Sequence, residues 1–389
     1  MPLVPHALDT IEDLIRFPTV SAHSNRDLIA YVVERLAAHD IPVRLFENAD
    51  GTKANLLATI GPADVPGIVL SGHSDVVPTE GQAWSHDPFS PWRADGRLHG
   101  RGACDMKGFL GLVLAAVPRL AARPLARPVH IAISYDEEVG CAGVGSLVAH
   151  LATLETKPLF VLIGEPTEMR IVTAHKGIRV IRTRITGRAA HSSMPEAGAN
   201  ALVAAAEIIG FLSTLATRLK GTCDDRFDPP CTTINIGRMR GGAAVNIIAE
   251  TAEIEWEYRP LPGTDAEALL AEVEAFAKAR VLPVLQQGAG EAAAITFESV
   301  ATAPALDTRG GEDAEAFLRR VLGANRAHAV SFTTEAGLFQ DVAGIPAIVC
   351  GPGSVRQAHK PDEYVSFAQL ERAQSLIDAL CDAAERGEL

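Results

Sequence analysis

The sequence lacks long apolar runs and targeting signals. No continuous apolar stretch reaches the roughly 18 residues that a membrane-spanning helix requires. Residues 1–6 (MPLVPH) contain no basic segment followed by an apolar one, so we expect no signal peptide. We therefore expect a cytoplasmic protein with no membrane partner.

Basic residues are also scarce. The 389 residues include 35 Lys and Arg against 48 Asp and Glu, which gives a formal net charge of −13. Nucleic acids and anionic membranes attract proteins with basic surfaces, so the composition argues against both as partners. It favours cations, including metal ions and basic small molecules.

Cysteine is infrequent and shows no regular spacing. The six cysteines form no CxxC pair, and in a cytosolic chain we expect them to be reduced and structural. Cys104 precedes Asp105, but no general base is evident for it, which argues against a nucleophilic role. Cys223 and Cys231 bracket a loop rich in Pro and Asp. They could form a disulfide, although a reducing compartment would oppose it.

The length of the chain predicts two domains, because 389 residues exceed one ordinary hydrophobic core. Strands and helices alternate up to residue 167, which is typical of a doubly wound α/β fold with a mostly parallel sheet. Residues 177–298 instead follow the order β-α-β-β-α-β of a ferredoxin-like α+β unit. We predict a metal-binding catalytic domain from residues 1–176 and 299–389, with residues 177–298 inserted as a lid and dimerisation domain.

Apolar periodicity also predicts the individual elements. One helix begins at Asp105, whose position near the N-terminal end suits an acidic residue. The predicted helices span residues 6–16, 25–39, 105–120, 200–218, 265–280, 311–322 and 366–386. The main predicted strands span residues 42–46, 54–60, 67–70, 129–134, 159–163, 178–185, 232–236, 252–258, 294–299 and 345–350.

Acidic residues and histidines recur just after four of the short apolar runs, those that end at residues 70, 134, 163 and 350. In an open α/β sheet, ligands bind in the crevice beyond the carboxyl ends of the strands. We therefore expect these side chains to converge. The candidate metal ligands are His73, Asp105, Glu138, Glu165 and His359.

Two imidazoles with several carboxylates suit zinc, cobalt or manganese and fit calcium poorly. A catalytic zinc takes three protein ligands and a water, so five ligands are too many for one ion. They suffice for two ions if one carboxylate bridges, so we expect two divalent ions per chain. Zinc is the expected metal and cobalt is the alternative. Glu137 is assigned as the general base that deprotonates water and later protonates the leaving nitrogen. Asp75 is assigned as the acceptor that orients His73.

Four segments resemble a known family of two-zinc deacylases. They are residues 71–78 (SGHSDVVP), 100–108 (GRGACDMKG), 135–140 (YDEEVG) and 164–167 (GEPT). The family contains acetylornithine deacetylase, succinyl-diaminopimelate desuccinylase, aminoacylases and glutamate carboxypeptidases, and the resemblance covers nearly the whole chain. It implies one zinc on His73 and Glu165, the other on Glu138 and His359, and Asp105 as the bridge. It also implies a cis peptide bond after Asp105.

The inserted segment carries further motifs of that family. Residues 187–195 (GRAAHSSMP) resemble its second-domain motif, which implies that His191 stabilises the oxyanion, often from the partner subunit of a homodimer. Residues 241–246 (GGAAVN) and 258–260 (YRP) resemble its substrate segment, with Asn246 and with Arg259 as a clamp for an α-carboxylate. In the other domain, Glu335 is a candidate partner for a substrate ammonium and Gly353 a candidate substrate contact.

The resemblance implies metal-dependent hydrolysis of a small N-acyl amino acid. Residues 173–177 (TAHKG), 334–337 (TEAG) and 359–364 (HKPDEY) resemble the acetylornithine branch, so the expected reaction converts N2-acetyl-L-ornithine to L-ornithine and acetate, as in arginine biosynthesis. The alternatives are N-acetylcitrulline, other N-acyl amino acids and succinyl-diaminopimelate. Two further alternatives are a non-catalytic metal-binding paralogue and an iron-dependent redox protein.

Overall fold

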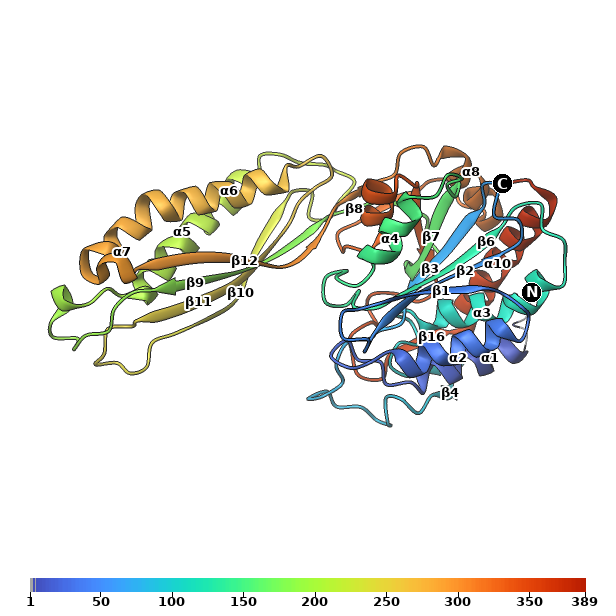
Figure 1. Cartoon of the computed structure of the whole chain (residues 1–389), viewed down its shortest axis with the longest axis horizontal. Coiled ribbons are helices and arrows are strands. Elements are labelled where there is room, and N and C mark those ends of the chain that lie inside the picture. Colours follow the sequence, from blue (N-terminus) through green and yellow to red (C-terminus); the bar gives the residue numbers. More distant parts are fainter. Residues whose placement is uncertain (1–2, 4) are drawn as a thin grey trace. The chain divides into compact units, whose positions relative to one another are not determined.

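The chain forms two compact units in a computed structural model that describes residue 3 and residues 5–389. Unit 1 contains the residues up to Ala174 together with Leu306–Ala329 and Thr334–Leu389, and unit 2 contains His175–Ala305 and Val330–Thr333 (Figure 1). Residues 1, 2 and 4, which the predicted first domain includes, lie outside the described residues. The predicted second boundary, after residue 298, lies seven residues too early. It does so because strand β12 (Ala294–Ala303) continues to pair with β9 (Ile178–Thr186) up to Ala303.

Unit 1 is built on a nine-stranded mixed sheet. At its centre, β6 (Val129–Ser134), β3 (Ile68–His73), β7 (Phe160–Pro166) and β15 (Ala347–Gly351) run parallel in that order. Every residue of these four strands is buried, as expected for parallel strands covered on both faces. The flanking strands are β1 (Val43–Glu47), β2 (Ala54–Ile60), β8 (Val172–His175), β13 (Leu306–Asp307) and β14 (His328–Val330).

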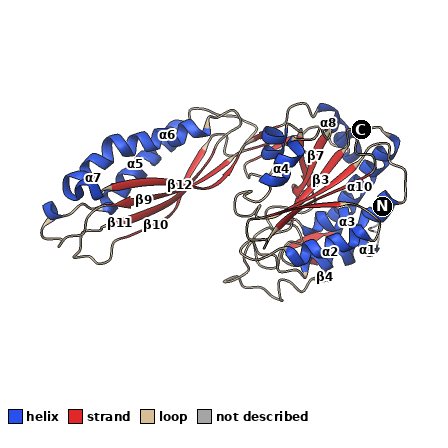
Figure 2. Ribbon diagram, viewed as in Figure 1, coloured by secondary structure: helices blue, strands red, loops and turns tan. Residues whose placement is uncertain are grey.

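Helices lie on both sides of this sheet (Figure 2). Helix α3 (Lys107–Ala121) is buried along most of its length and contacts α1 (Pro5–Ile15) and α10 (Phe367–Arg386). The remaining helices of eight or more residues in the described part of unit 1 are α2 (Arg26–Ala37), α4 (Gly145–Ala152) and α8 (Glu312–Leu322). A small sheet formed by β4 (Trp92–Ala94), β5 (Arg97–His99) and β16 (Tyr364–Ser366) completes the unit.

Unit 2 has the predicted β-α-β-β-α-β order. Its antiparallel sheet runs β10 (Thr233–Gly241), β11 (Thr251–Arg259), β9 and β12, which is the strand order of a ferredoxin-like fold. The single helix predicted over residues 265–280 is instead divided into α6 (Ala266–Phe276) and α7 (Leu282–Ala289), with a wider turn at Ala277–Val281. Pro283 stands in the first turn of α7, where its missing N–H is tolerated. The predicted fold class is confirmed.

Helix α5 (Ala201–Leu219) is the one helix among the described residues that is long and apolar enough to cross a membrane. Length and composition alone do not assign it there, because core helices pass the same test. Ala205, Ile208 and Leu212 are fully buried in the core of unit 2, and α5 contacts β9, β10 and β11. The helix therefore covers a sheet within a folded unit.

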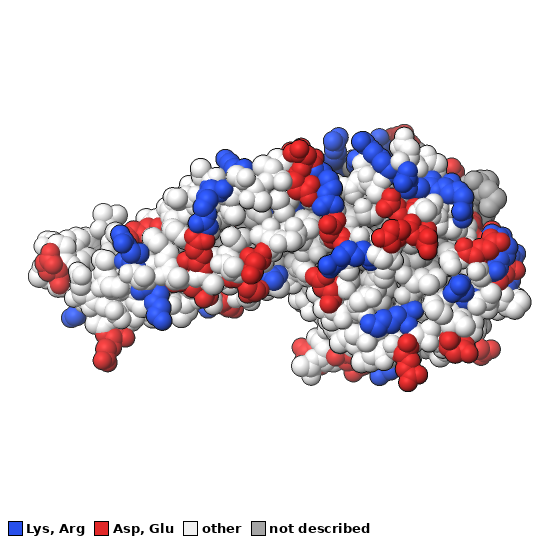
Figure 3. Space-filling view, turned by 90° about the horizontal axis from the view of Figure 1, so that it is seen from above, with Lys and Arg blue, Asp and Glu red and all other residues white. Residues whose placement is uncertain are grey.

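The surface carries charges of both signs. On the face in Figure 3, acidic and basic side chains alternate over both units rather than gathering in one patch of either sign. In unit 2, ion pairs also join Arg182 to Glu255 and Arg184 to Glu253 across neighbouring strands. The excess of acid is therefore distributed over the visible face.

Gly164 lies in β7 against α3. A Cβ built on Gly164 would lie 2.0 Å from ring atoms of Phe109, whereas one on Gly145, at the start of α4, meets none of the described atoms within 4 Å. We expect Gly164→Ala to lower the thermal unfolding midpoint of the metal-free protein, because overpacking costs about 1–3 kcal/mol. Gly145→Ala is the matched control and should be neutral or stabilising. Circular dichroism on heating measures both, and an unchanged midpoint for Gly164→Ala would contradict the packing.

Candidate metal centre

The four central strands of unit 1 bring the predicted ligands to one edge of the sheet. His73 is the last residue of β3, Glu165 is the last but one of β7, and Glu138 follows the end of β6. His359 follows β15 in a loop, and Asp105 lies in the loop that leads into α3. Because the carboxyl ends of parallel strands share one edge, the four strand-end ligands converge.

Asp105 lies between the two histidines. Its Oδ1 is 3.1 Å from His73 Nε2, and its Oδ2 is 3.3 Å from His359 Nε2. Glu165 Oε1 lies 3.8 Å from His73 Nε2, and Glu138 Oε2 lies 3.0 Å from His359 Nε2. Two sets of three side chains therefore share the Asp105 carboxylate.

The donor atoms are close enough together for metal binding. Ligand atoms of His73, Asp105 and Glu138 lie within 4.8 Å of one another, and so do those of His73, Glu137 and Glu165. Imidazole and carboxylate donors of this kind suit zinc and its first-row neighbours. The side chains thus fit two divalent ions that share Asp105, with Glu137 beside them as a further carboxylate.

Electrostatic repulsion among the buried acids is strong. Burial raises the pKa of Glu137 and the pKa of Glu165 well above the usual range, and neighbouring carboxylates raise both further against the opposing effect of His73. Burial and Asp105 raise the pKa of Glu138 to about 7, although His359 and His73 oppose this rise. Bound cations would relieve this repulsion, which supports a metal-binding role for the cluster.

The same acids stabilise the protonated forms of the two histidines. Hydrogen bonds to Asp105 and Glu138 raise the pKa of His359 to about 10. Burial alone would lower the pKa of His73, but Asp105 and Glu165 raise it well above its usual range. The acids around each imidazole therefore favour its protonated form, with which a bound metal ion would compete.

Comparison with known proteins identifies the family. The model of "Peptidase family M20/M25/M40" matches residues 69–383. The chain belongs to this family. The acetylornithine deacetylase of Proteus mirabilis (strain HI4320) is 35% identical over 391 residues, and that of Pasteurella multocida (strain Pm70) is 31% identical over 389 residues. The alignments cover 97% and 98% of each chain, respectively.

Solved structures share the fold. An M20 metallo-carboxypeptidase from Sulfolobus solfataricus superposes with a TM-score of 0.77 at 18% identity, covering 98% of this chain and 100% of that one. A dinuclear metal binding M20 peptidase from Bacillus subtilis gives a TM-score of 0.65 at 18% identity, covering 97% and 98%. The predicted family resemblance is thus confirmed, and the M20 chain is a metal-dependent hydrolase.

The Asp75 side chain of this M20 hydrolase does not act as expected on His73. The main-chain carbonyl of Asp75 accepts the His73 Nδ1 hydrogen bond at 2.8 Å, whereas the Asp75 carboxylate stays 3.6 Å from that nitrogen. The carboxylate instead accepts the backbone N–H groups of Glu137 and Glu138 at 3.1 and 3.3 Å and the Ser21 hydroxyl at 2.6 Å. Asp75 therefore positions the two glutamates through their backbone.

The loop before α3 departs from the sequence prediction in one respect. Asp105 does not begin the helix, because α3 starts at Lys107 and its N-cap, Met106, makes no side-chain capping bond. The peptide bond between Asp105 and Met106 is cis, as the family resemblance implied. The carboxylate of Asp105 contacts both histidines.

Glu363 is a buried residue that we had not singled out from the sequence. Its Oε1 accepts the backbone N–H groups of Cys104 and Asp105 at 2.9 and 3.1 Å, and its Oε2 accepts from Arg101 Nη1 at 2.7 Å. The side chains of Glu363 and Arg101 are each 1% exposed. Glu363 thus holds the Asp105 backbone in place. Its position in the quoted HKPDEY segment, four residues after His359, was the available signal.

Glu335 and Gly353 are the two predicted substrate contacts in unit 1, and their surroundings differ. Glu335 is 1% exposed, and its Oε1 has no hydrogen-bond partner among the described residues. Burial raises the pKa of Glu335 to about 7, opposed by the neighbouring Ser134 and His73. Gly353 has no free backbone donor for a substrate, because its N–H donates to Gln369 Oε1 at 2.7 Å.

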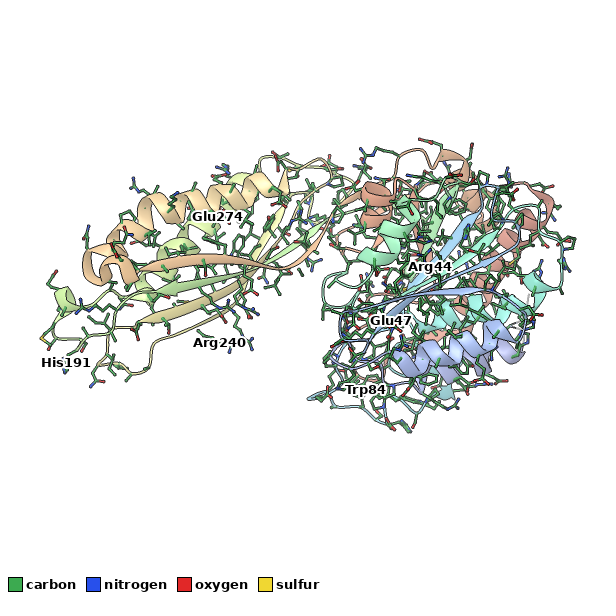
Figure 4. The ribbon with its side chains drawn as sticks, in the orientation of Figure 1. Arg44, Glu47, Trp84, His191, Arg240 and Glu274 are labelled. Carbon is green, nitrogen blue, oxygen red and sulfur yellow. The ribbon has the colours of Figure 1, made fainter. Side chains whose placement is uncertain are left out.

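The other predicted substrate residues belong to unit 2 and do not form one cluster there. His191 pairs with Ile247, and the N–H of Ser192 donates to the carbonyl of Asn246 at 3.0 Å, so His191 and Asn246 are neighbours. Both are exposed, and His191 lies at the tip of the unit (Figure 4). Arg259 ends β11, whose first residue pairs with the last residue of β9. The length of β11 places Arg259 roughly 25 Å from that tip.

The Glu363 contacts generate a test. We expect Glu363→Gln to weaken metal binding roughly 10- to 100-fold, because the amide loses the charge that pairs with Arg101 and offers only one acceptor oxygen. Glu155→Gln, at an exposed site in the same unit, is the control and should bind metal as the wild type does. Competition with a chromogenic chelator measures the affinities. Equal affinity for Glu363→Gln and wild type would show that the Asp105 loop holds its shape without Glu363.

Proposed function

We propose that this hydrolase cleaves the amide bond of N2-acetyl-L-ornithine to give L-ornithine and acetate. The observation that carries the proposal is the Asp105 carboxylate, with one oxygen directed to each of two histidines that have their own glutamate. Relatives named acetylornithine deacetylase, aligned over 97% or more of both chains, support the choice of substrate.

The proposed metal ligands are His73 and Glu165 for one ion, Glu138 and His359 for the other, and Asp105 for both. When bound, two divalent ions polarise the amide carbonyl and lower the pKa of the attacking water. Zinc is the proposed ion and cobalt the alternative. The buried donor set supports this proposal, because it offers more ligands than one catalytic ion uses.

Glu137 is the proposed general base. Its carboxylate lies beside those of Glu138 and Glu165, and Asp75 holds its backbone N–H. Burial raises the pKa of Glu137 well above the usual range, and a raised pKa suits a carboxyl that accepts a proton and later returns it. In the proposed reaction, Glu137 takes a proton from the attacking water and later delivers it to the leaving nitrogen.

Glu335 is the proposed partner for the side-chain ammonium of the substrate. A buried carboxylate oxygen without a hydrogen bond is costly, and an ammonium would supply both charge and donors. Arg259 remains a proposed clamp for the α-carboxylate, and Asn246 beside His191 is a further proposed contact. Because roughly 25 Å separates Arg259 from His191 within one unit 2, the two would act on one substrate only from different subunits. His191 is a proposed oxyanion donor that acts in its own subunit or in that of a homodimer partner. The dimer and the cytoplasmic location remain predictions.

A substrate panel tests the proposed function. Purified enzyme with added zinc or cobalt is offered N-acetylornithine, N-acetylcitrulline, N-acetylmethionine and succinyl-diaminopimelate, and amine release is followed with ninhydrin. We expect the highest kcat/KM with N-acetylornithine and loss of all turnover with a chelator. Faster turnover of another substrate would replace the proposed substrate and retain the deacylase chemistry. Turnover that survives metal removal would reject the metal mechanism.

The same panel tests Glu335. Glu335→Gln should raise KM for N-acetylornithine roughly tenfold or more, because a charge-assisted hydrogen bond contributes about 1.5–3 kcal/mol. KM for N-acetylmethionine, which lacks the ammonium, should change little. A parallel rise for both substrates would assign Glu335 to the structure of the site instead.

Glu137→Gln tests the general base. We expect turnover to fall roughly 100- to 10,000-fold while two metal ions per chain remain bound, because the amide cannot accept the proton. Metal content by elemental analysis and kcat for the best substrate of the panel are measured together. Loss of metal from this variant, with normal turnover in the fraction that keeps it, would make Glu137 a ligand.

A further inference from the structure

Cys223 and Cys231 face each other in unit 2, remote in sequence from every metal ligand. The two residues form an isolated antiparallel bridge, and both thiols are free. Residues 224–230 form the loop between them, with Arg226 paired to Asp224. The sequence had suggested a possible disulfide here, and the pairing now provides a geometric basis for it.

The type of pairing favours a bond between the sulfurs. The backbone N–H of Asp224 donates to the carbonyl of Pro230 at 2.7 Å, which makes Cys223 and Cys231 the non-hydrogen-bonded pair of the bridge. Residues in such a pair have Cα atoms about 4.5 Å apart and their side chains close together. Disulfides span Cα distances of about 4.4–6.8 Å, so a pair of this type has a typical spacing that a disulfide can bridge.

The two thiols differ in access, and the backbone around them is fixed. Cys223 is exposed, and its Sγ donates to the carbonyl of Lys220 at 3.3 Å, whereas Cys231 is buried. Lys176 Nζ donates to the carbonyls of Pro229 and Cys231 at 2.7 and 2.6 Å. An exposed thiol can meet an oxidant, and a held neighbour can then resolve the intermediate.

We propose that Cys223 and Cys231 form a reversible redox site whose oxidant is a low-molecular-weight disulfide. The Cys223 thiolate attacks one sulfur of the oxidant, a mixed disulfide forms, and one thiol is released. The Cys231 thiolate then attacks Cys223 Sγ, the protein disulfide forms, and the second thiol leaves. Two cysteine protons are transferred to the two released thiols, and the oxidant is reduced by two electrons.

Closure of this bond would fix a loop that contacts the start of the first segment of unit 2 and its short second segment. Lys176 stands where the chain enters the unit, and Ser331 belongs to the short second segment, Val330–Thr333. The Ser331 hydroxyl donates to the carbonyl of Asp228 at 2.6 Å. The redox state of the cysteine pair would thus set the rigidity of a loop that both segments contact.

Peptide mapping tests the site directly. The intact metal-loaded protein is incubated with oxidised glutathione, its free thiols are alkylated, and it is digested with trypsin without reductant. Trypsin cleaves after Arg226, so the two cysteines fall in separate peptides, residues 221–226 and 227–238. We expect these peptides to be joined, with the loss of two free thiols per chain, and to separate again after treatment with dithiothreitol.

Cysteine variants and the alternative oxidation products test whether the bond joins Cys223 to Cys231. Cys223→Ser and Cys231→Ser should each abolish the joined peptides, and Cys381→Ser, at a buried thiol in α10, should retain them. A stable glutathione adduct on Cys223 with Cys231 still free would overturn the proposal. So would a bond between Cys223 residues of two chains, visible as a dimer on a non-reducing gel, or no loss of thiol at all.

Discussion

Mutual repulsion among buried carboxylates is the constraint on which the rest of unit 1 depends. Four acids, at positions 105, 137, 138 and 165, share one small volume with only two imidazoles. Such a cluster is unfavourable unless cations occupy it and the backbone prevents the acids from moving apart. Asp75 and Glu363 supply that backbone restraint, because each accepts two N–H groups next to an acid of the cluster.

The ligands could be predicted because strand order and strand ends are visible in a sequence. His73, Glu138 and Glu165 each follow or end a run that is buried on both faces, and parallel strands place such ends together. The α+β order of unit 2 could be predicted for the same reason, since alternation of apolar residues marks β9 and β11 clearly. Both predictions use only the pattern of apolar residues within single segments of the chain.

Contacts between distant segments could not be predicted in this way. Glu363 meets the Asp105 backbone across more than 250 residues of sequence, and Asp75 meets Glu137 across more than 60. Nor does periodicity indicate whether a backbone carbonyl or a carboxylate will accept from His73, because that choice depends on the shape of the turn after β3. Arg259 illustrates the same limit, since its motif predicted a function, whereas its distance from His191 follows only from the strand register.

The order of the strands in the sheet has a consequence for synthesis of the chain. Strand β7 ends at Pro166, but its parallel neighbour β15 begins only at Ala347. Ribosomes add about 5–20 residues per second, so roughly 10–35 seconds separate the two strands as they are made. During that interval unit 2 can be completed, while β7 presents an open edge and the cluster of acids lacks His359. The last segment to leave the ribosome therefore closes both the sheet and the metal centre, and a chain that stops short of it would expose an edge prone to pairing with other chains.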